Sequence, residues 1–379
     1  MAAVNRVWTG GLMACALAVV LASGFGCHCK NKSMTILPSP LADTAAVLPE
    51  GVTLPAGFYP LAGHYQPNSQ DDDYNGWPRY IVSDKDDMIM AYVPAQAIVM
   101  GGGAGLDEVP ARTVSVSHFY IDLHEVSNAQ FNRFYRLAVR QDEKDSSWSP
   151  EHPLRANDPD YCGAMGRPWQ VTRAFKDFWR LSANNLHPVR NVSWWEANSY
   201  SRWTGKQLPT EAQWEAAARG SDRRKYPWGN QSTSEVTRYL CNSKTQKANY
   251  DGYEYTAPVE SFAGGVSPYG VYQMAGNVAE WCSDWYDPGR YAYPSLEDPP
   301  SDVIRGPKLF GDRNYPNPQD KDARNARVGP LRGDQKAIRG GSFADPIESC
   351  RVETREAARP DAHLNDVGFR CVLPLASAQ

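Results

Sequence analysis

The distribution of apolar and polar residues predicts a folded domain that begins near Met88. Short apolar runs over residues 88–93 and 97–100, separated by Pro94, are typical of β-strands. From Lys30 to about Asp87 the chain is rich in Pro, Gly, Ser and Asp and has no sustained apolar period. We therefore predict a tether in this segment, with the alternative that part of it folds back.

Three helices are predicted by the same local device at their start. A Ser or Thr side chain accepts a hydrogen bond from the N–H three residues later, while a Gln or Glu at that later position bonds back. This pattern occurs at Ser127-Asn-Ala-Gln130, Ser193-Trp-Trp-Glu196 and Thr210-Glu-Ala-Gln213, and the third helix is expected to end at Gly220. Each helix has an apolar face to bury. The faces consist of Phe131, Phe134 and Tyr135 in the first helix, Trp194, Ala197 and Tyr200 in the second, and Trp214, Ala217 and Ala218 in the third.

Two long segments, 140–186 and 287–336, lack such periodicity, and the second is dense in Pro, Gly, Asp and Arg. Irregular stretches of this length are usually binding loops or disorder, and we interpret them as loops that line a groove. The glycine run Gly101-Gly-Gly-Ala-Gly105 lacks the Lys and Ser or Thr of a phosphate-binding loop, so it is interpreted as a turn.

The N-terminus predicts export. Residues 1–26 have a cationic start followed by an apolar run over 12–21, which is a signal-peptide pattern too short to span a bilayer. Cleavage before Cys27 would resemble processing of a bacterial lipoprotein, so residues 27–87 are predicted to be the lipid attachment and tether, and residues 88–375 the domain. The protein would then be a membrane lipoprotein that faces the periplasm or cell surface. The alternative is an ordinary secretory signal that leaves Cys27 and Cys29 as thiols.

The net charge and the cysteine spacing argue against several classes of function. A formal net charge of -4 gives no reason to expect nucleic-acid binding. Beyond Cys29 the cysteines are odd in number and lack zinc-site spacing, so neither a disulfide framework nor a structural metal can be inferred. No Gly-x-Ser-x-Gly motif is present. The histidines His118 and His124 have strand-like spacing and are interpreted as surface or satisfied residues.

A series of motifs from Ala91 to Leu375 resembles the formylglycine-generating enzyme (sulfatase-modifying factor) domain, and the motifs occur in the family's order. They are His118-Phe-Tyr-Ile-Asp-Leu-His-Glu-Val-Ser-Asn-Ala-Gln-Phe131, His187-Pro-Val-Arg-Asn-Val-Ser-Trp-Trp-Glu-Ala197, Gly205-Lys-Gln-Leu-Pro-Thr-Glu-Ala-Gln-Trp-Glu-Ala-Ala-Ala-Arg-Gly220, Tyr226-Pro-Trp-Gly-Asn230, Tyr269-Gly-Val-Tyr-Gln-Met-Ala-Gly-Asn-Val-Ala-Glu-Trp281, Ile338-Arg-Gly-Gly-Ser-Phe343, Arg355-Glu-Ala-Ala-Arg359 and Val367-Gly-Phe-Arg-Cys371.

The resemblance implies a loop-rich α+β domain related to C-type-lectin-like folds, with bound calcium. Calcium prefers oxygen ligands. One family site corresponds to the side chains of Asn242 and Asp251 and the carbonyls of Ser243 and Tyr253. A second site corresponds to Glu280 and the carbonyls of Gly276 and Val278, with Gln273 where Asn is usual. For Asn242 and Asp251 the alternative is that they are turn residues that cap their own backbone.

The resemblance also implies a copper oxidase site, but this chain departs from it. In the family two thiolates hold Cu(I) after the Gly-Gly-Ser motif. Counting from Ser342 places them at Asp345 and Cys350, and counting back from the Arg355 motif shifts the second place to Arg351, so neither register has a cysteine pair. Copper binding is therefore unlikely by sequence, and Ser342 and Cys350 are the remaining candidate catalytic residues.

Other positions at which this chain departs from the family also argue against an oxidase site. Ala279 replaces a Trp that lines the oxidase pocket, which we expect to empty that pocket. Cys371 is retained, but Ser201 and Ala218 occupy the positions of half-cystine partners. Cys350 is therefore interpreted as a small buried residue or as part of an unassigned bridge.

Two hypotheses remain. In the first, the protein is a non-oxidase component of the cell envelope that binds a peptide, a glycan or an envelope protein. In the second, it is a formylglycine-generating oxidase or related protein-modifying enzyme with an altered metal site, in which Cys350 acts with Asp345.

Overall fold

The computed structural model describes residues 39–64, 76–134, 185–231, 240–244, 251–289, 291 and 333–375. The chain divides into the units Met1–Ile36 and Leu37–Gln379, and all described residues lie in the second. The predicted export signal, Cys27, Tyr135 and most of both irregular segments lie outside the described residues. Within the described part of the chain, no helix has the length and apolarity required to cross a membrane.

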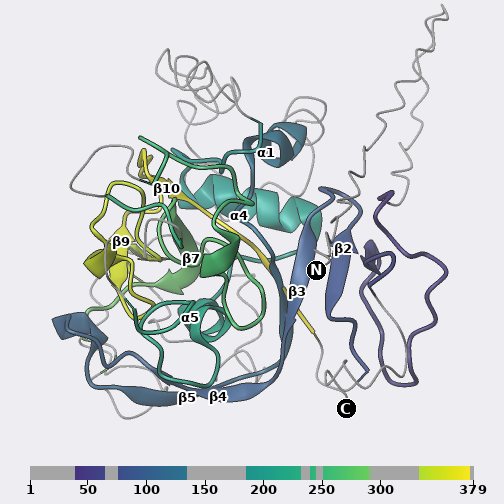
Figure 1. Ribbon diagram of the computed structural model, residues 1–379, viewed down its shortest axis with the longest axis horizontal. Coiled ribbons are helices and arrows are strands. Elements are labelled where there is room, and N and C mark those ends of the chain that lie inside the picture. Colours follow the sequence, from purple (N-terminus) through teal and green to yellow (C-terminus); the bar gives the residue numbers. More distant parts are fainter. Residues whose placement is uncertain are drawn as a thin grey trace, which may run out of the picture. The chain divides into compact units, whose positions relative to one another are not determined.

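A five-stranded antiparallel sheet has the order β1-β2-β3-β6-β11. Its strands are β1 (Phe58–Pro60), β2 (Tyr80–Ser83), β3 (Ile89–Val93), β6 (Phe119–Asp122) and β11 (Val372–Pro374). The last strand of the described residues thus pairs with β6, and both ends of the motif region meet in one sheet (Figure 1). Strands β1 and β2 belong to the segment assigned to the tether, so the folded domain extends into that segment.

A second, four-stranded sheet has the order β10-β7-β8-β9, with β10 and β7 parallel and the other pairs antiparallel. Its strands are β7 (Ala279–Trp285), β8 (Lys336–Arg339), β9 (Arg355–Ala358) and β10 (Val367–Gly368). The hairpin of β4 (Gln96–Met100) and β5 (Arg112–Val116) is separate. Helix α5 (Glu211–Arg219) packs between this hairpin and the second sheet (Figure 1). The remaining short elements are the 3-10 turns η1 (Leu106–Glu108), η3 (Ala263–Gly265) and η5 (Ile347–Ser349).

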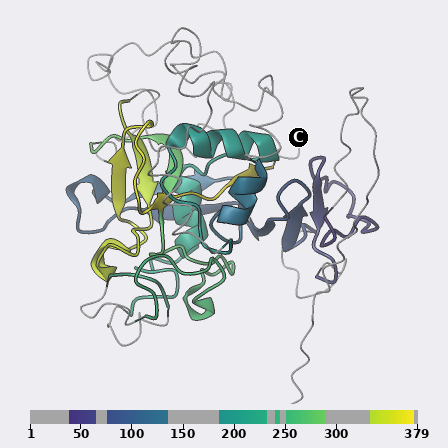
Figure 2. The ribbon, with the colours of Figure 1, turned by 90° about the horizontal axis from the view of Figure 1, so that it is seen from above.

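The three predicted helices are confirmed, together with their starts. Helix α1 covers Asn128–Phe134, and α4 covers Trp194–Thr204. The side chains of Ser193 and Thr210 accept from the backbone N–H groups of Glu196 and Gln213, and both capping boxes are closed. Gly220 ends α5 at a φ of 68°. Figure 2 shows α4, in teal, beside α1, in blue.

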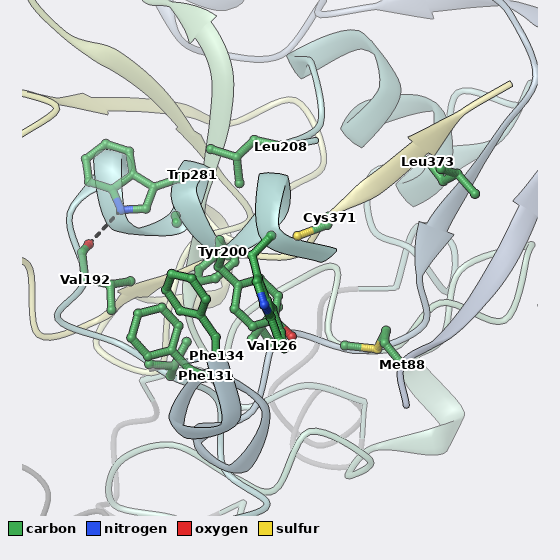
Figure 3. Packing of buried hydrophobic residues seen from close by; sticks show 14 of the residues in the cluster. Met88, Val126, Phe131, Phe134, Val192, Tyr200, Leu208, Trp281, Cys371 and Leu373 are labelled. Atoms are coloured by element: carbon green, nitrogen blue, oxygen red, sulfur yellow. Dashed lines mark hydrogen bonds between the residues drawn. The ribbon is translucent and has the colours of Figure 1, made fainter. Parts of the chain in front are cut away.

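The largest hydrophobic cluster lies where α1 and α4 meet the five-stranded sheet. Phe131 stacks on Tyr200 with ring centroids 5.9 Å apart, and Phe134 contacts the same ring edge-on. Figure 3 shows these rings close to Cys371, and the Trp281 indole donating to the Val192 carbonyl at 2.9 Å. The predicted apolar faces are therefore buried as expected for every face residue that the structure describes.

The two histidines differ from the sequence interpretation in one respect, because they flank strand β6 and do not lie within it. His118 contacts the Tyr92 hydroxyl through Nδ1 at 3.2 Å. His124 lies against the Tyr272 ring, and burial followed by the charge of Arg370 lowers its pKa to about 4. The strand is shorter than the alternation suggests, because the chain turns after Asp122.

Candidate functional site

The loop that follows β8 carries the candidate catalytic residues. Gly340 and Gly341 both have positive φ, and a Cβ on Gly341 would lie 2.9 Å from the Cys350 sulfur. Glycine therefore allows the strand to turn tightly over Cys350. Ser342, which is fully buried, follows directly.

Ser342 and Asp345 form one closed hydrogen-bonded unit. The Ser342 backbone N–H and hydroxyl both donate to Asp345 Oδ2, at 2.9 and 2.6 Å. The same hydroxyl lies 3.2 Å from Asp366 Oδ2. A hydroxyl has one hydrogen, so the two carboxylates share a single donor. Asp345 is thereby held in place as an oxygen acceptor at the position where the family has a thiolate.

Cys350 lies beneath this loop and away from solvent. Its side chain is 0% exposed, and its sulfur lies 3.9 Å from the Ser342 carbonyl and 3.7 Å from the Pro346 carbonyl. Burial, followed by the charges of Cys241 and Asp345, raises the pKa of the Cys350 thiol well above its ordinary value. The structure thus brings Ser342, Asp345 and Cys350 together. The Ser342 hydroxyl contacts both Asp345 and Asp366, whereas the Cys350 thiol lies on the buried side of the loop.

Ala279 is the first residue of β7, and its N–H donates to the Asp366 carbonyl at 2.9 Å. The position of the missing aromatic is therefore adjacent to the Ser342 loop. Ala279 is 1% exposed and belongs to the largest hydrophobic cluster. The substitution thus places a small core side chain at this position.

An aromatic surface, formed by Tyr255 and Phe343, lies beside the loop, and no sequence motif predicts it as a site. Tyr255 is 56% exposed and packs edge-on against Phe343. The Arg190 guanidinium lies 5.7 Å from the centre of the Phe343 ring, and Asp366 is one of the charges acting on it. Leu186, 60% exposed, accepts from the Val259 N–H through its carbonyl. Apolar, cationic and acidic groups therefore lie within one short stretch of surface.

The first predicted calcium set is brought together by the fold. Asn242 is 1% exposed, and its Nδ2 donates to the Tyr255 carbonyl at 2.7 Å. Asp251 Oδ1 accepts from the Tyr253 N–H at 3.1 Å, whereas Asp251 Oδ2 is buried and has no hydrogen-bond partner among the described residues. Burial raises the Asp251 pKa, although backbone N–H groups including that of Ser243 oppose the shift. A buried carboxylate oxygen without a donor is an arrangement that fits a cation.

The second predicted set fits less well. Gln273 is 4% exposed, and both of its amide atoms lack partners, which leaves an oxygen available. Glu280, in contrast, accepts from Arg370 through both oxygens and from the Trp214 indole at 2.8 Å. Its charge is therefore already compensated without a metal. Among the described residues, no group of three or more His, Cys, Asp or Glu side chains converges as a metal centre.

Backbone hydrogen bonds link the two sets to each other and to the Ser342 loop. Asn277 N–H donates to the Asn242 carbonyl at 2.7 Å, and Gly276 N–H donates to the Gly340 carbonyl at 3.0 Å. Asn277 Nδ2 also donates to the buried Glu125, whose pKa is raised well above its ordinary value by burial and then by Glu280. The calcium sets and the Ser342 loop are thus mechanically connected.

The model of the sulfatase-modifying factor enzyme 1-like domain matches residues 82–375 of this chain. The formylglycine-generating enzyme of Streptomyces coelicolor is 34% identical over 285 residues, covering 70% of this chain and 81% of that protein. A Mus musculus protein named inactive C-alpha-formylglycine-generating enzyme 2 is 31% identical over 322 residues, covering 78% and 88%. Among solved structures, PvdO from Pseudomonas aeruginosa superposes with a TM-score of 0.51 at 20% identity, covering 77% of this chain and 96% of that one.

The two sheets, the few helices and the Gly-Gly-Ser loop define an α+β protein with the fold of formylglycine-generating enzymes, a relative of C-type-lectin-like folds. The chain belongs to the sulfatase-modifying factor enzyme 1-like family. The resemblance inferred from the motifs is therefore confirmed at the level of family and fold. Relatives with this level of identity include proteins named as enzymes and one named as inactive, so family membership alone does not assign the chemistry.

Proposed function

We propose that this protein is a membrane-anchored member of the family that acts in the cell envelope by binding and not by oxidation. The observation that carries the proposal is the Ser342–Asp345 unit. Both Ser342 donors point at one Asp345 oxygen, in the place of the first copper-binding thiolate. A carboxylate is a hard ligand that suits Ca²⁺ or Mg²⁺ and contributes little to Cu(I) binding.

The state of Cys350 supports the same conclusion. Copper binding requires the thiolate, but burial raises the pKa of this thiol and therefore favours its neutral form. The thiol also lies beneath the loop, where a peptide cysteine would not meet it without a change in the loop's conformation.

A second candidate function, an oxidase with an altered metal site, is favoured by the cluster in which Cys350 lies. Cys241 belongs to the same small hydrophobic cluster as Cys350, and so offers a second sulfur from another segment. Burial also raises the pKa of Cys241, to about 12. Two neutral, buried thiols are a poor starting point for a copper site that must exchange substrate, so binding remains our preferred function.

The aromatic surface supports a binding role. Tyr255 and Phe343 offer ring faces and edges, Arg190 adds a cation, and Asp366 adds a carboxylate. This combination suits a peptide, a glycan or an envelope protein, because rings stack on apolar faces while the charged groups orient polar ones. A pull-down from detergent-solubilised envelope, compared between the wild type and Tyr255→Ala, would identify the partner.

We expect no conversion of a Cys-x-Pro-x-Arg peptide to formylglycine by the copper-loaded protein with oxygen and a thiol reductant. The physical reason is the missing thiolate at Asp345. Mass spectrometry of the peptide measures the aldehyde. The converse variant, Asp345→Cys with Ala279→Trp, is expected to gain copper binding, because it restores both family residues. Aldehyde formed by the unmutated protein and abolished in Cys350→Ala would establish an oxidase and refute the binding proposal.

We also propose that the first calcium set binds Ca²⁺. Metal that binds only the folded state stabilises it by about 2.7 kcal/mol at a hundredfold excess over Kd. Chelation should therefore lower the Tm, and Asp251→Ala should remove most of that response because it deletes the buried, unpartnered oxygen. Gln273→Ala should matter less, since Arg370 already compensates Glu280. A wild-type melting curve that does not move with chelator would contradict calcium binding.

The membrane anchor is proposed from the sequence at Cys27. Acyl chains on this residue would hold the protein at the membrane, at about 0.8 kcal/mol for each buried CH₂. Cys27→Ser is therefore expected to shift the protein from the membrane fraction to the soluble periplasm, as measured by fractionation and immunoblotting. Cys29→Ser is the matched control and should leave the distribution unchanged. Membrane retention of the Cys27→Ser variant would count against lipidation.

A further inference from the structure

Two buried thiols from distant parts of the chain share one small cluster. Cys241 is 1% exposed and Cys350 is 0% exposed, and both are free thiols in the structure. Among the described residues, the buried members of their cluster are completed by Tyr226, Ala275 and Ile347, with Trp228 packed against it. The polar contacts of the sulfurs are weak: Cys241 with the Ser243 hydroxyl at 3.8 Å, and Cys350 with the carbonyls described above.

The backbone fixes the two segments against each other next to the thiols. The Lys244 N–H donates to the Asp345 carbonyl at 2.7 Å, and Lys244 forms a parallel bridge with Pro346. The turn η5 then leads the chain back to Cys350, whose N–H donates to the Ile347 carbonyl. Two short segments therefore carry the cysteines into the cluster from a common point of pairing.

We propose that Cys241 and Cys350 are a redox pair that forms an intramolecular disulfide when a small-molecule disulfide is available as oxidant. Each thiol gives up its hydrogen and one S–S bond forms. The two electrons and two protons reduce the S–S bond of the oxidant to two thiols. The proposal is independent of the binding function, and the bond would also withdraw Cys350 from any copper chemistry.

The surroundings favour the disulfide once it has formed. A disulfide is neutral and needs no hydrogen bond, so it suits a cluster of apolar side chains. The two side chains are 1% and 0% exposed, so a dissolved oxidant has little access to either sulfur in the folded chain. Oxidation should therefore proceed while the chain folds or opens locally, and should be slow in the folded, reduced protein.

The chain contains matched controls. Cys282 and Cys371 are equally buried free thiols, but each belongs to a different hydrophobic cluster, and neither of those clusters contains a second described cysteine. They therefore share the burial of the proposed pair and lack the neighbouring cysteine.

The test uses the full chain, denatured and reduced, then refolded in a buffer of oxidised and reduced glutathione and mapped by mass spectrometry without reductant. We expect a cross-linked peptide that joins Cys241 to Cys350, that disappears with reductant, and that persists in Cys282→Ala. Folded, reduced protein exposed to the same oxidant should form it at least about tenfold more slowly, because both sulfurs are buried and the oxidant has little access to them. The oxidised form should melt about 5 °C higher than the reduced form.

Quantitative alkylation of both cysteines in the refolded, oxidised protein would overturn the proposal, and so would pairing of either one with a different cysteine. The wild-type peptide map decides the outcome even where an alanine variant does not fold. In Cys241→Ala or Cys350→Ala protein that does fold, the difference in Tm between oxidised and reduced samples should vanish, whereas Cys371→Ala should retain it.

Discussion

Replacing Lys206 by Met is expected to lower the free energy of unfolding by about 3–5 kcal/mol at neutral pH. The ammonium lies 2.8 Å from Asp86 Oδ2 and 2.9 Å from Asp122 Oδ1, and all three side chains are 0% exposed. Tyr200 donates to the same Asp86 oxygen at 2.7 Å, and the Cys371 N–H donates to Asp122. The network joins α4, through Tyr200, to the turn between β2 and β3, through Asp86, and to β6, through Asp122. Lys206 is the cation that bonds both carboxylates. Met keeps the length of the side chain and leaves two buried carboxylates without a counter-charge.

The size of this loss should depend on pH. In the wild type, burial outweighs Lys206 and raises the Asp122 pKa to about 6. Burial alone would raise the Asp86 pKa too, but the charge and hydrogen bond of Lys206 bring it below its ordinary value. A raised folded-state pKa contributes stability that is present below the unfolded pKa and is lost as pH rises through the folded value. Without Lys206 both carboxylates follow this rule, so the variant should be least impaired at acidic pH, near the unfolded pKa of Asp, and increasingly impaired as the pH rises towards neutral.

Urea unfolding of wild type and Lys206→Met at acidic and neutral pH measures this dependence. Arg359→Met is the control, because it removes an ion pair with Asp361 whose side chains are 74% and 53% exposed. It should leave the urea midpoint nearly unchanged. Equal losses for Lys206→Met at both pH values would show that packing, and not the unpaired carboxylates, accounts for the effect.

The helices could be predicted because their signals are local. A capping box needs only four consecutive residues, and the apolar face needs three turns, so Ser193 and Thr210 define the starts of α4 and α5 without tertiary information. Strands β1 and β2 could not be separated from a tether, because three or four residues among Pro and Gly have no period to detect. β1 pairs with β2, and β2 pairs with β3, so the stability of both strands depends on a sheet built from residues outside their own segments.

In the candidate site, too, the local features could be predicted from the sequence and the long-range contacts could not. The Gly-Gly-Ser motif located Ser342, Asp345 and Cys350, and the structure places them in one loop. The groups that decide what this loop can do come from elsewhere in the sequence. Asp366 reaches the Ser342 hydroxyl from the turn before β10, and Cys241 shares a cluster with Cys350 although it lies in another segment. No spacing rule predicts such neighbours, because their separation in sequence is set by the intervening fold.

Gly276→Ala is expected to cost more than about 4 kcal/mol, a loss found only for a few structural causes. Gly276 has a φ of 75°, and a Cβ there would lie 2.1 Å from the Asn242 carbonyl oxygen. That oxygen belongs to backbone and accepts the Asn277 N–H at 2.7 Å, so it cannot move aside without breaking the bond. Strain at positive φ alone costs about 1–2 kcal/mol. The remaining loss comes from moving the Gly276 segment away from the Asn242 segment, which breaks the hydrogen bond between Asn277 and Asn242.

Gly252→Ala separates these two contributions. Gly252 also has positive φ, at 101°, and lies between Asp251 and Tyr253 of the first calcium set, but a Cβ there meets nothing within 4 Å. It should therefore lose only about 1–2 kcal/mol from backbone strain. Thermal and urea unfolding of both variants, with and without Ca²⁺, provide the comparison. Because the Gly276 contact joins the Asn242 segment to the loop that carries Ser342, Gly276→Ala should also abolish the stabilisation by calcium, whereas Gly252→Ala should retain part of it. Equal losses in the two variants would mean that the contact with the Asn242 carbonyl does not hold the two segments together.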